Sequence, residues 1–371
     1  MSKAPKTSSF KKQPDEENVS RRQVLAGAVG TALAGLSASA TAQYSGLMEG
    51  GLGVPFRLPM GALNYLDRNQ YIHNMEIISY TEGHPIASGE PLMAMWARGD
   101  QRLLPTGNGW LDLSNPQDPE YIDAGVRIQG AIAYQETTDK WIMMRTHGQP
   151  LSGAQPEYPF GRWHEENRRR AMSYSGLRGI RTWDITDPTS PDLMDEFSTG
   201  ETGSGTHQNY YDGGQYAFLD AGWSDQFRME NAQRPHGNGL MVVDLSDPAN
   251  ITEVSRWHVP GQLLGEEDEY KKYWFAGDHA AWTASHGAPC MPVRVEDGGR
   301  YGYGGFGHFG MITFDFSDIR NPRPVSQFLW DGESIGGIPY HTVLPIVDSN
   351  GRFNNTLIGL PEVIEPDCRE P

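Results

Sequence analysis

The stretch Gly239-Leu240-Met241-Val242-Val243-Asp244-Leu245-Ser246-Asp247-Pro248 decides the fold, because its pattern occurs four times along the chain. In each copy a glycine precedes an aspartate by five residues, and Ser/Thr followed by Asp/Asn begins two residues after that aspartate. The copies occupy residues 107–116, 179–188, 239–248 and 310–318. The β-branched and aromatic run predicts a strand. The Ser-Asp-Pro that follows predicts an Asx-type turn that ends it.

The spacing of the copies predicts a repeat of larger units. The aspartates Asp112, Asp184, Asp244 and Asp315 are 72, 60 and 71 residues apart. A unit that recurs at such a loose period and is rich in strand and turn formers is typical of blade-like repeats. Polar and apolar residues mix in the segments that follow three copies, as in half-exposed outer strands. These segments are 192–197, 251–257 and 324–330. We therefore predict an all-β chain.

The repeated pattern resembles the LVIVD repeat of a bacterial and archaeal β-propeller family, whose units carry a VVDLSDP core. The resemblance covers about residues 100–345. It implies a β-propeller built from LVIVD-like blades, and it implies no particular activity. A propeller closes its ring to protect strand edges, yet no fifth Gly-x4-Asp copy follows the fourth. Either N-terminal strands complete the last blade or the chain is a fragment. We favour the fragment, which would leave the propeller incomplete at its C-terminus.

The chain divides into three parts at the level of sequence. Residues 1–42 form a signal peptide, 43–70 a Gly- and Pro-rich irregular arm, and 71–371 the propeller blades. Five blade units are expected, with strands at 75–80, 91–96, 126–134, 141–144, 206–211, 215–219, 278–282, 339–345 and 356–358. A polar insert at 148–175 is expected to be a surface loop over one face.

The N-terminus predicts export. Six basic residues precede or flank an apolar run that ends near Leu36, and Ala38-Ser39-Ala40-Thr41-Ala42 offers a cleavage site. The pair Arg21-Arg22 resembles a twin-arginine (Tat) signal; the alternative is a general secretory signal with a chance arginine pair. The run is too short to span a bilayer. We expect a periplasmic or secreted bacterial protein.

Charge and cysteine content limit the partners. The net charge is −17, and residues 1–42 contribute +3, so the remainder carries −17 − 3 = −20. Such a chain is not expected to bind nucleic acid or an anionic membrane. A small-molecule substrate or a protein partner remains. Cys290 and Cys368 either form a disulfide or stay as free thiols.

Three histidines fall at one place in the repeat. His207, His279 and His341 open the first strand after three of the turn copies. Because the first strand of each blade lines the propeller channel, we expect these imidazoles to converge and to bind Zn, Fe, Cu or Mn. His73 opens the first unit in the same way and is kept in reserve. The alternative is that each histidine forms a structural hydrogen bond to a neighbouring blade.

A second set of histidines lies beside glycine at strand ends. Of these, His286 and His308 are the better candidates for proton carriers near the channel, whereas His147 and His236 read as caps. Two functions follow from these residues. One is a metal-dependent enzyme with a histidine-lined site, and the other is a binding module that uses loops such as 148–175.

Overall fold

The computed structural model describes residues 78–79, 95–148, 174–227, 238–266, 268–269, 285–329, 338–348 and 352–362. All of them belong to the compact unit Asn74–Pro371. Antiparallel strands dominate, and helix is almost absent from the described residues; the 3₁₀ turn η1 (Gly307–Phe309) is one short example. The all-β prediction is confirmed.

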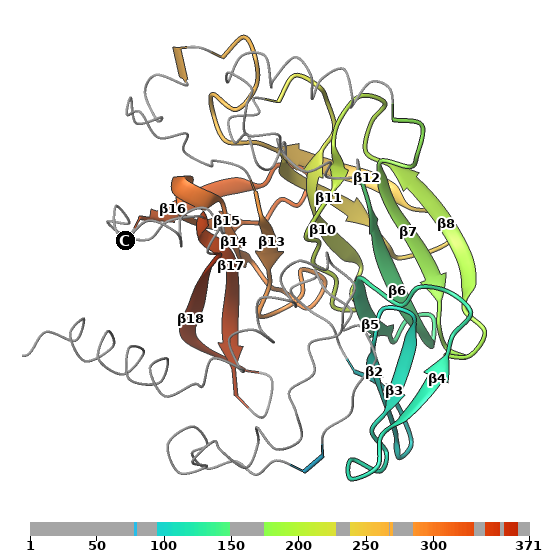
Figure 1. The fold of residues 1–371 in the computed structure, drawn as a ribbon. Helices are drawn as coiled ribbons and strands as arrows, with labels where there is room; N and C mark the ends of the chain where they lie inside the picture. Colours follow the sequence, from blue (N-terminus) through green and yellow to red (C-terminus); the bar gives the residue numbers. More distant parts are fainter. Residues whose placement is uncertain are drawn as a thin grey trace, which may run out of the picture. The chain divides into compact units, whose positions relative to one another are not determined.

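Four sheets have four strands each, and in every one the spatial order follows the chain order (Figure 1). The first two sheets contain β1 (Trp96–Arg98), β2 (Gln101–Pro105), β3 (Gly109–Asp112) and β4 (Glu120–Asp123), then β5 (Ala131–Gln135), β6 (Lys140–His147), β7 (Gly179–Asp184) and β8 (Asp192–Ser198). The next two contain β9 (Gly205–Thr206), β10 (Tyr216–Gly222), β11 (Gly239–Asp244) and β12 (Thr252–Trp257), then β13 (Gly287–Cys290), β14 (Tyr301–Gly305), β15 (Met311–Asp315) and β16 (Arg323–Phe328). A two-stranded sheet pairs β17 (Ile338–Val347) with β18 (Phe353–Glu362). Such four-stranded up-and-down sheets are the blades of a β-propeller.

The repeated stretch is the third strand of each blade, namely β3, β7, β11 and β15. Each repeat aspartate ends its strand as an Asx turn, because Oδ1 accepts the backbone N–H two residues further on. The donors are Ser114 to Asp112 at 2.8 Å, Thr186 to Asp184 at 2.9 Å, Ser246 to Asp244 at 2.7 Å and Ser317 to Asp315 at 3.0 Å. The predicted turn is therefore confirmed in all four copies.

The same aspartates also bind the start of the second strand of their own blade. The donors are Gln101, Lys140, Gln215 and Arg300, for Asp112, Asp184, Asp244 and Asp315 in turn. Burial by itself would raise the pKa of Asp244. The hydrogen bonds from Ser246 and Gln215 outweigh burial, so that pKa lies below its ordinary value. The aspartate thus joins the second strand, the third strand and the turn of each blade.

The repeat glycine permits close approach of the outer strand. A Cβ on Gly239 would lie 2.5 Å from the carbonyl oxygen of Trp257 in β12, and a Cβ on Gly310 would lie 2.5 Å from that of Phe328 in β16. Gly179 faces the Phe197 carbonyl in the same way. A side chain at these positions would push the fourth strand away from the third.

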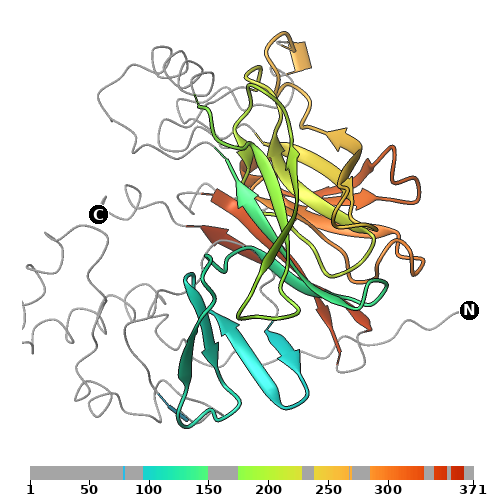
Figure 2. The same ribbon diagram turned by 90° about the vertical axis from the view of Figure 1, so that its right-hand side faces the viewer.

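Apolar clusters fill the space between consecutive sheets, which lie side by side (Figures 1 and 2). The cluster between the second and third sheets includes Met144 and Met241. The one between the third and fourth includes Phe218 and Phe314. Hydrogen bonds cross the same boundaries: the indole of Trp96 donates to the Ile185 carbonyl at 2.9 Å. Each blade therefore depends on its neighbours for a core.

The strand predictions agree in part with the described strands. The segments predicted at 141–144, 339–345 and 356–358 lie within β6, β17 and β18, the segment 215–219 overlaps β10 from Tyr216 onward, and the Gly213-Gly214 turn is present. Of the segments predicted at 126–134 and 206–211, only Ala131–Tyr134 and Thr206 belong to strands. In the first blade, Ile78 and Ser79 are irregular, and the first described strand begins at Trp96. In the fourth blade, the first described strand is β13 rather than a strand at 278–282, which lies outside the described residues.

Other sequence expectations also fall outside the described residues. They are the signal peptide 1–42, the arm 43–70, most of the insert 148–175, His73, His236, His279 and Cys368. Cys290 is a buried free thiol at the end of β13. Burial raises the pKa of that thiol far above its ordinary value.

Candidate functional site

Three histidines from three blades meet where the first strands of the blades adjoin. His207 follows β9, His286 precedes β13, and His341 lies in β17. The ring centroids of His207 and His286 are 4.7 Å apart in an edge-to-face arrangement. Those of His286 and His341 are 4.1 Å apart and tilted by 46°. We call these three residues the histidine cluster.

Backbone contacts fix the cluster in place. The N–H of His207 donates to the Asp220 carbonyl of β10 at 3.0 Å, and the N–H of His286 donates to the Gly305 carbonyl of β14 at 3.1 Å. Gly305 itself allows β17 to approach, since a Cβ there would lie 2.6 Å from the His341 carbonyl oxygen. The glycine-rich strand β14 therefore makes room for the strand that carries His341.

The hydrogen bonds of His341 define its tautomer. Its Nδ1 lies 2.6 Å from the Thr342 hydroxyl oxygen, and its Nε2 lies 3.1 Å from Nε2 of Gln208. Because an amide nitrogen can only donate, Nε2 of His341 is the acceptor and Nδ1 carries the proton. With Gln208 in this orientation, the Nε2 lone pair of His341 is directed at the Gln208 amide nitrogen.

Asp220 is a buried carboxylate beside the cluster that the sequence analysis did not single out. It is fully buried in β10, and its Oδ2 lies 3.5 Å from the backbone nitrogen of Gln208. It interrupts the apolar stretch Ala217-Phe218-Leu219 of the same strand. The sequence could have marked Asp220, because it is a single charged residue within a strand whose other residues are mostly apolar. A carboxylate buried in such a strand requires polar partners.

A group of buried polar side chains flanks the cluster on the third and fourth blades. Ser204 donates its hydroxyl to Oδ1 of Asn238 at 2.9 Å, and the backbone N–H of Ser285 donates to the Asn238 carbonyl at 2.9 Å. The amide of Gln262 donates to the same carbonyl at 2.7 Å. Ser285 immediately precedes His286, so this group and the histidine cluster share a chain segment.

Three of the five predicted site residues lie together in the histidine cluster, and the other two do not belong to it as described. His207 and His341, predicted as metal ligands, meet at the cluster, and His286, predicted as a proton carrier, lies between them. His308 lies in η1. His279 lies outside the described residues. Within the described ranges, no group of three or more His, Cys, Asp or Glu side chains has the geometry of a metal site.

His147 ends β6 rather than joining the cluster. Burial, assisted by the nearby charges of Arg181 and Arg145, lowers the pKa of His147 to about 4. This histidine is therefore neutral at physiological pH. Its Nε2 is buried and has no hydrogen-bond partner among the residues that the structure describes.

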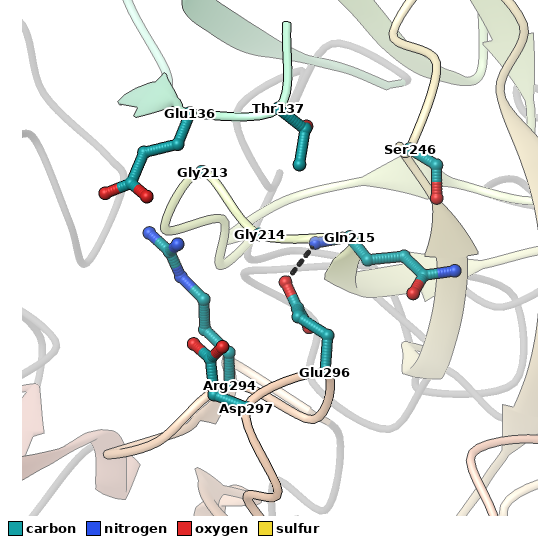
Figure 3. A pocket seen from close by; sticks show the side chains of 9 residues that line it. All are labelled: Glu136, Thr137, Gly213, Gly214, Gln215, Ser246, Arg294, Glu296 and Asp297. Carbon is teal, nitrogen blue, oxygen red and sulfur yellow. Dashed lines mark hydrogen bonds between the residues drawn. The ribbon is translucent and has the colours of Figure 1, made fainter.

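A polar pocket of about 280 Å³ lies at the strand turns of the second, third and fourth blades (Figure 3). Glu136, Glu296 and Asp297 line it together with Arg294. The Arg294 guanidinium is already paired, because it donates to the Asp212 carbonyl at 2.5 Å and lies 3.3 Å from Oδ1 of the same residue. Glu296 accepts the backbone N–H of Gln215, shown as a dashed line in Figure 3.

Comparison with known proteins supports the fold. Residues 236–259, which include all of β11 and β12, match the LVIVD repeat. With the four-stranded blades, this match defines a β-propeller-type protein that carries an LVIVD repeat. No curated protein matches the chain. None of the helical residues described here forms a helix long and apolar enough to cross a membrane.

Proposed function

We propose that this chain is an exported β-propeller that holds a transition metal at the histidine cluster and uses it in a metal-dependent reaction on a small molecule. The observation that carries the proposal is the convergence of His207, His286 and His341 from three blades, with ring centroids 4.7 and 4.1 Å apart. His286 is fully buried and His207 and His341 are half-buried, and imidazoles gathered in this way favour a cation that prefers nitrogen ligands, such as Zn, Fe, Cu or Mn.

The surroundings of His341 suit a ligand. A metal-binding histidine usually donates its second ring N–H to a neighbouring oxygen, which fixes the tautomer. The contact between Nδ1 of His341 and Thr342 has this form. Rotation of the Gln208 side chain would free Nε2 for a metal. The proposal replaces the predicted trio by one in which His286 stands beside His207 and His341, while His279 remains an additional candidate.

A metal held here would supply Lewis acidity toward a bound substrate or water. The protein residues would contribute burial and orientation. His286 is fully buried, and the Asp220 carboxylate beside the cluster would favour a bound cation. His308, in η1, remains the second predicted proton carrier.

Export belongs to the same proposal, on the basis of residues 1–42. Tat export carries folded proteins, which suits a site that is filled before translocation. Replacement of Arg21 and Arg22 by lysine is expected to retain the protein in the cytoplasm, as measured by cell fractionation. Unchanged export would contradict a Tat route.

The decisive test is elemental analysis of protein produced through its own export route. We expect one transition metal per chain, lost in the double variant His207→Gln/His341→Gln. The variant His258→Gln is the matched control, because His258 pairs with Glu266 at 2.8 Å in a loop after β12 and contributes nothing to the cluster. Thermal unfolding would establish that each variant folds. Folded wild-type protein that binds no metal, even after exposure to Zn²⁺, would refute the proposal.

A second candidate is a binding module whose histidines are structural. It is favoured by the fact that both ring nitrogens of His341 have partners, Thr342 and Gln208. In that case the double variant would lose stability without any change in metal content.

A further inference from the structure

Two buried polar groups beside the histidine cluster have no partner in the described part of the chain. They are the amide nitrogen Nδ2 of Asn238 and the hydroxyl of Ser285. Asn238 is 1% exposed and Ser285 is fully buried. Buried donors without acceptors are costly. Such groups in a native protein point to a missing ligand or a buried water.

The amide of Asn238 is held rigidly in the position that leaves this donor unused. The side-chain Oδ1 of Asn238 accepts a hydrogen bond from the hydroxyl of Ser204. The backbone carbonyl of Asn238 accepts two more, from the backbone N–H of Ser285 and from the side-chain amide of Gln262. Gln262 is in turn anchored, because its Oε1 accepts the N–H of Val259 at 3.1 Å. A donor that is fixed before a ligand arrives binds with little reorganisation.

A largely buried cation is bonded to the backbone next to Ser204, the residue whose hydroxyl donates to Asn238. Arg178 donates through Nε to the carbonyl of Gly203 at 3.0 Å, one residue before Ser204. Arg178 as a whole residue is 8% exposed, so its charge is weakly screened by solvent. A positive charge together with two neutral donors favours an oxygen acceptor that carries negative charge.

We propose that Asn238 and Ser285 form a subsite that binds the carboxylate or carbonyl oxygen of a small substrate next to the histidine cluster. The subsite lies on the two blades that supply His207 and His286, and Ser285 is the residue before His286. This inference rests on the proposed function for the chemistry that follows binding, and it narrows the substrate class to oxygen acceptors. The positive charge of Arg178, bonded one residue before Ser204, favours the carboxylate.

The variant Ser285→Ala tests the subsite without disturbing the fold. Because the hydroxyl has no partner among the described residues, its removal breaks no hydrogen bond and is expected to leave thermal unfolding unchanged. The probes are acetate, for a carboxylate, and acetamide, for a neutral carbonyl. Binding is measured by ligand-observed NMR in protein stripped by a chelator and in Zn²⁺-loaded protein. Ser246→Ala, in the turn after β11, is the matched control.

We expect Ser285→Ala to weaken acetate binding about tenfold, as for the loss of one hydrogen bond to a charged group. The control should bind as the wild type does. A loss confined to acetamide would assign the subsite to neutral carbonyls. Equal binding of both probes to wild type and Ser285→Ala, with a water bridging Asn238 and Ser285 in a crystal structure, would overturn the inference.

The outcomes separate the two proposals. Ser285-dependent binding in a protein that takes up no metal would refute the metal site and support the subsite. Stoichiometric metal with no dependence on Ser285 would do the opposite.

Discussion

The imidazole of His286 lies 4.1 Å, centroid to centroid, from that of His341, although the two residues come from different blades. His286 precedes the first described strand of the fourth blade, and His341 lies in the first strand of the next sheet. The contact therefore depends on β13 and β17 lying side by side.

Gln208→Ala should tighten metal binding at the cluster. In the wild type the Gln208 amide lies 3.1 Å from Nε2 of His341, and a metal must displace it. Removing the amide should raise Zn²⁺ affinity by about threefold to tenfold, the equivalent of one neutral hydrogen bond. Competition with a chromogenic chelator would measure this change. Weaker binding would instead identify Gln208 as a supporting residue.

Gly239→Ala should destabilise the third blade by about 2 kcal/mol, as expected for overpacking. The new methyl would lie 2.5 Å from the Trp257 carbonyl oxygen and 2.7 Å from the Trp223 ring. Urea unfolding would measure the change in the free energy of unfolding. Gly359→Ala is the control, since a Cβ there meets nothing within 4 Å. Equal effects of both substitutions would contradict the assigned role of the repeat glycine.

Asp244→Ala should cost about 2 kcal/mol, because it removes the acceptor for the Ser246 N–H and for the Gln215 amide. Asp244→Asn retains one acceptor oxygen for Ser246 and should cost less than half as much. Chemical unfolding of the three proteins would rank them. If asparagine and alanine were equally harmful, the charge rather than the Asx turn would be the dominant contribution.

His147 should make stability depend on pH between about 4 and 6.5. Burial keeps its folded pKa at about 4, below the ordinary value of 6.5, so the unfolded chain binds a proton more readily. The stability contribution is present above pH 6.5 and is lost as the pH falls towards 4. His147→Gln should flatten this part of the urea-midpoint profile. A profile identical to that of the wild type would disprove the contribution of His147.

Cys290 should resist thiol reagents in the native protein. It is 2% exposed, and burial raises the pKa of its thiol, which disfavours the reactive thiolate. Labelling with iodoacetamide, followed by peptide mapping, should modify Cys290 only after denaturation. Rapid modification at neutral pH in the folded state would show that this part of the fourth blade opens.

The blades could be predicted because their signal is local. The strand, the aspartate and the Ser-Asp-Pro turn of 239–248 lie within ten residues, and the Asx hydrogen bond joins residues two apart. The second role of the aspartate could not be seen in this way. The hydrogen bond from Gln215 to Asp244 joins the start of β10 to the end of β11. The close approach of Gly239 to the Trp257 carbonyl joins β11 to β12.

Two of the three predicted metal ligands lie in the histidine cluster, and their binding of a metal stays a prediction. His207 and His341 were identified from their place in the repeat, and both lie in the cluster. The sequence pattern places His279 in this role in the fourth blade, but His279 lies outside the described residues, and the described histidine that reaches the cluster is His286, immediately before β13. The offset between turn and strand varies from blade to blade with the length of the connecting loops, so counting residues could not determine which histidine reaches the neighbouring blade.

The sequence by itself determined the class of fold, the third strand of each blade and the turn that ends it, because hydrogen bonds and strand propensity over ten residues encode them. Only the tertiary structure decided that His286 meets His207 and His341, that Asp220 lies buried beside them, and that Asn238 and Ser285 keep unused donors. Those relationships arise from packing between blades, and the residues involved are far apart in the chain and carry no shared local pattern.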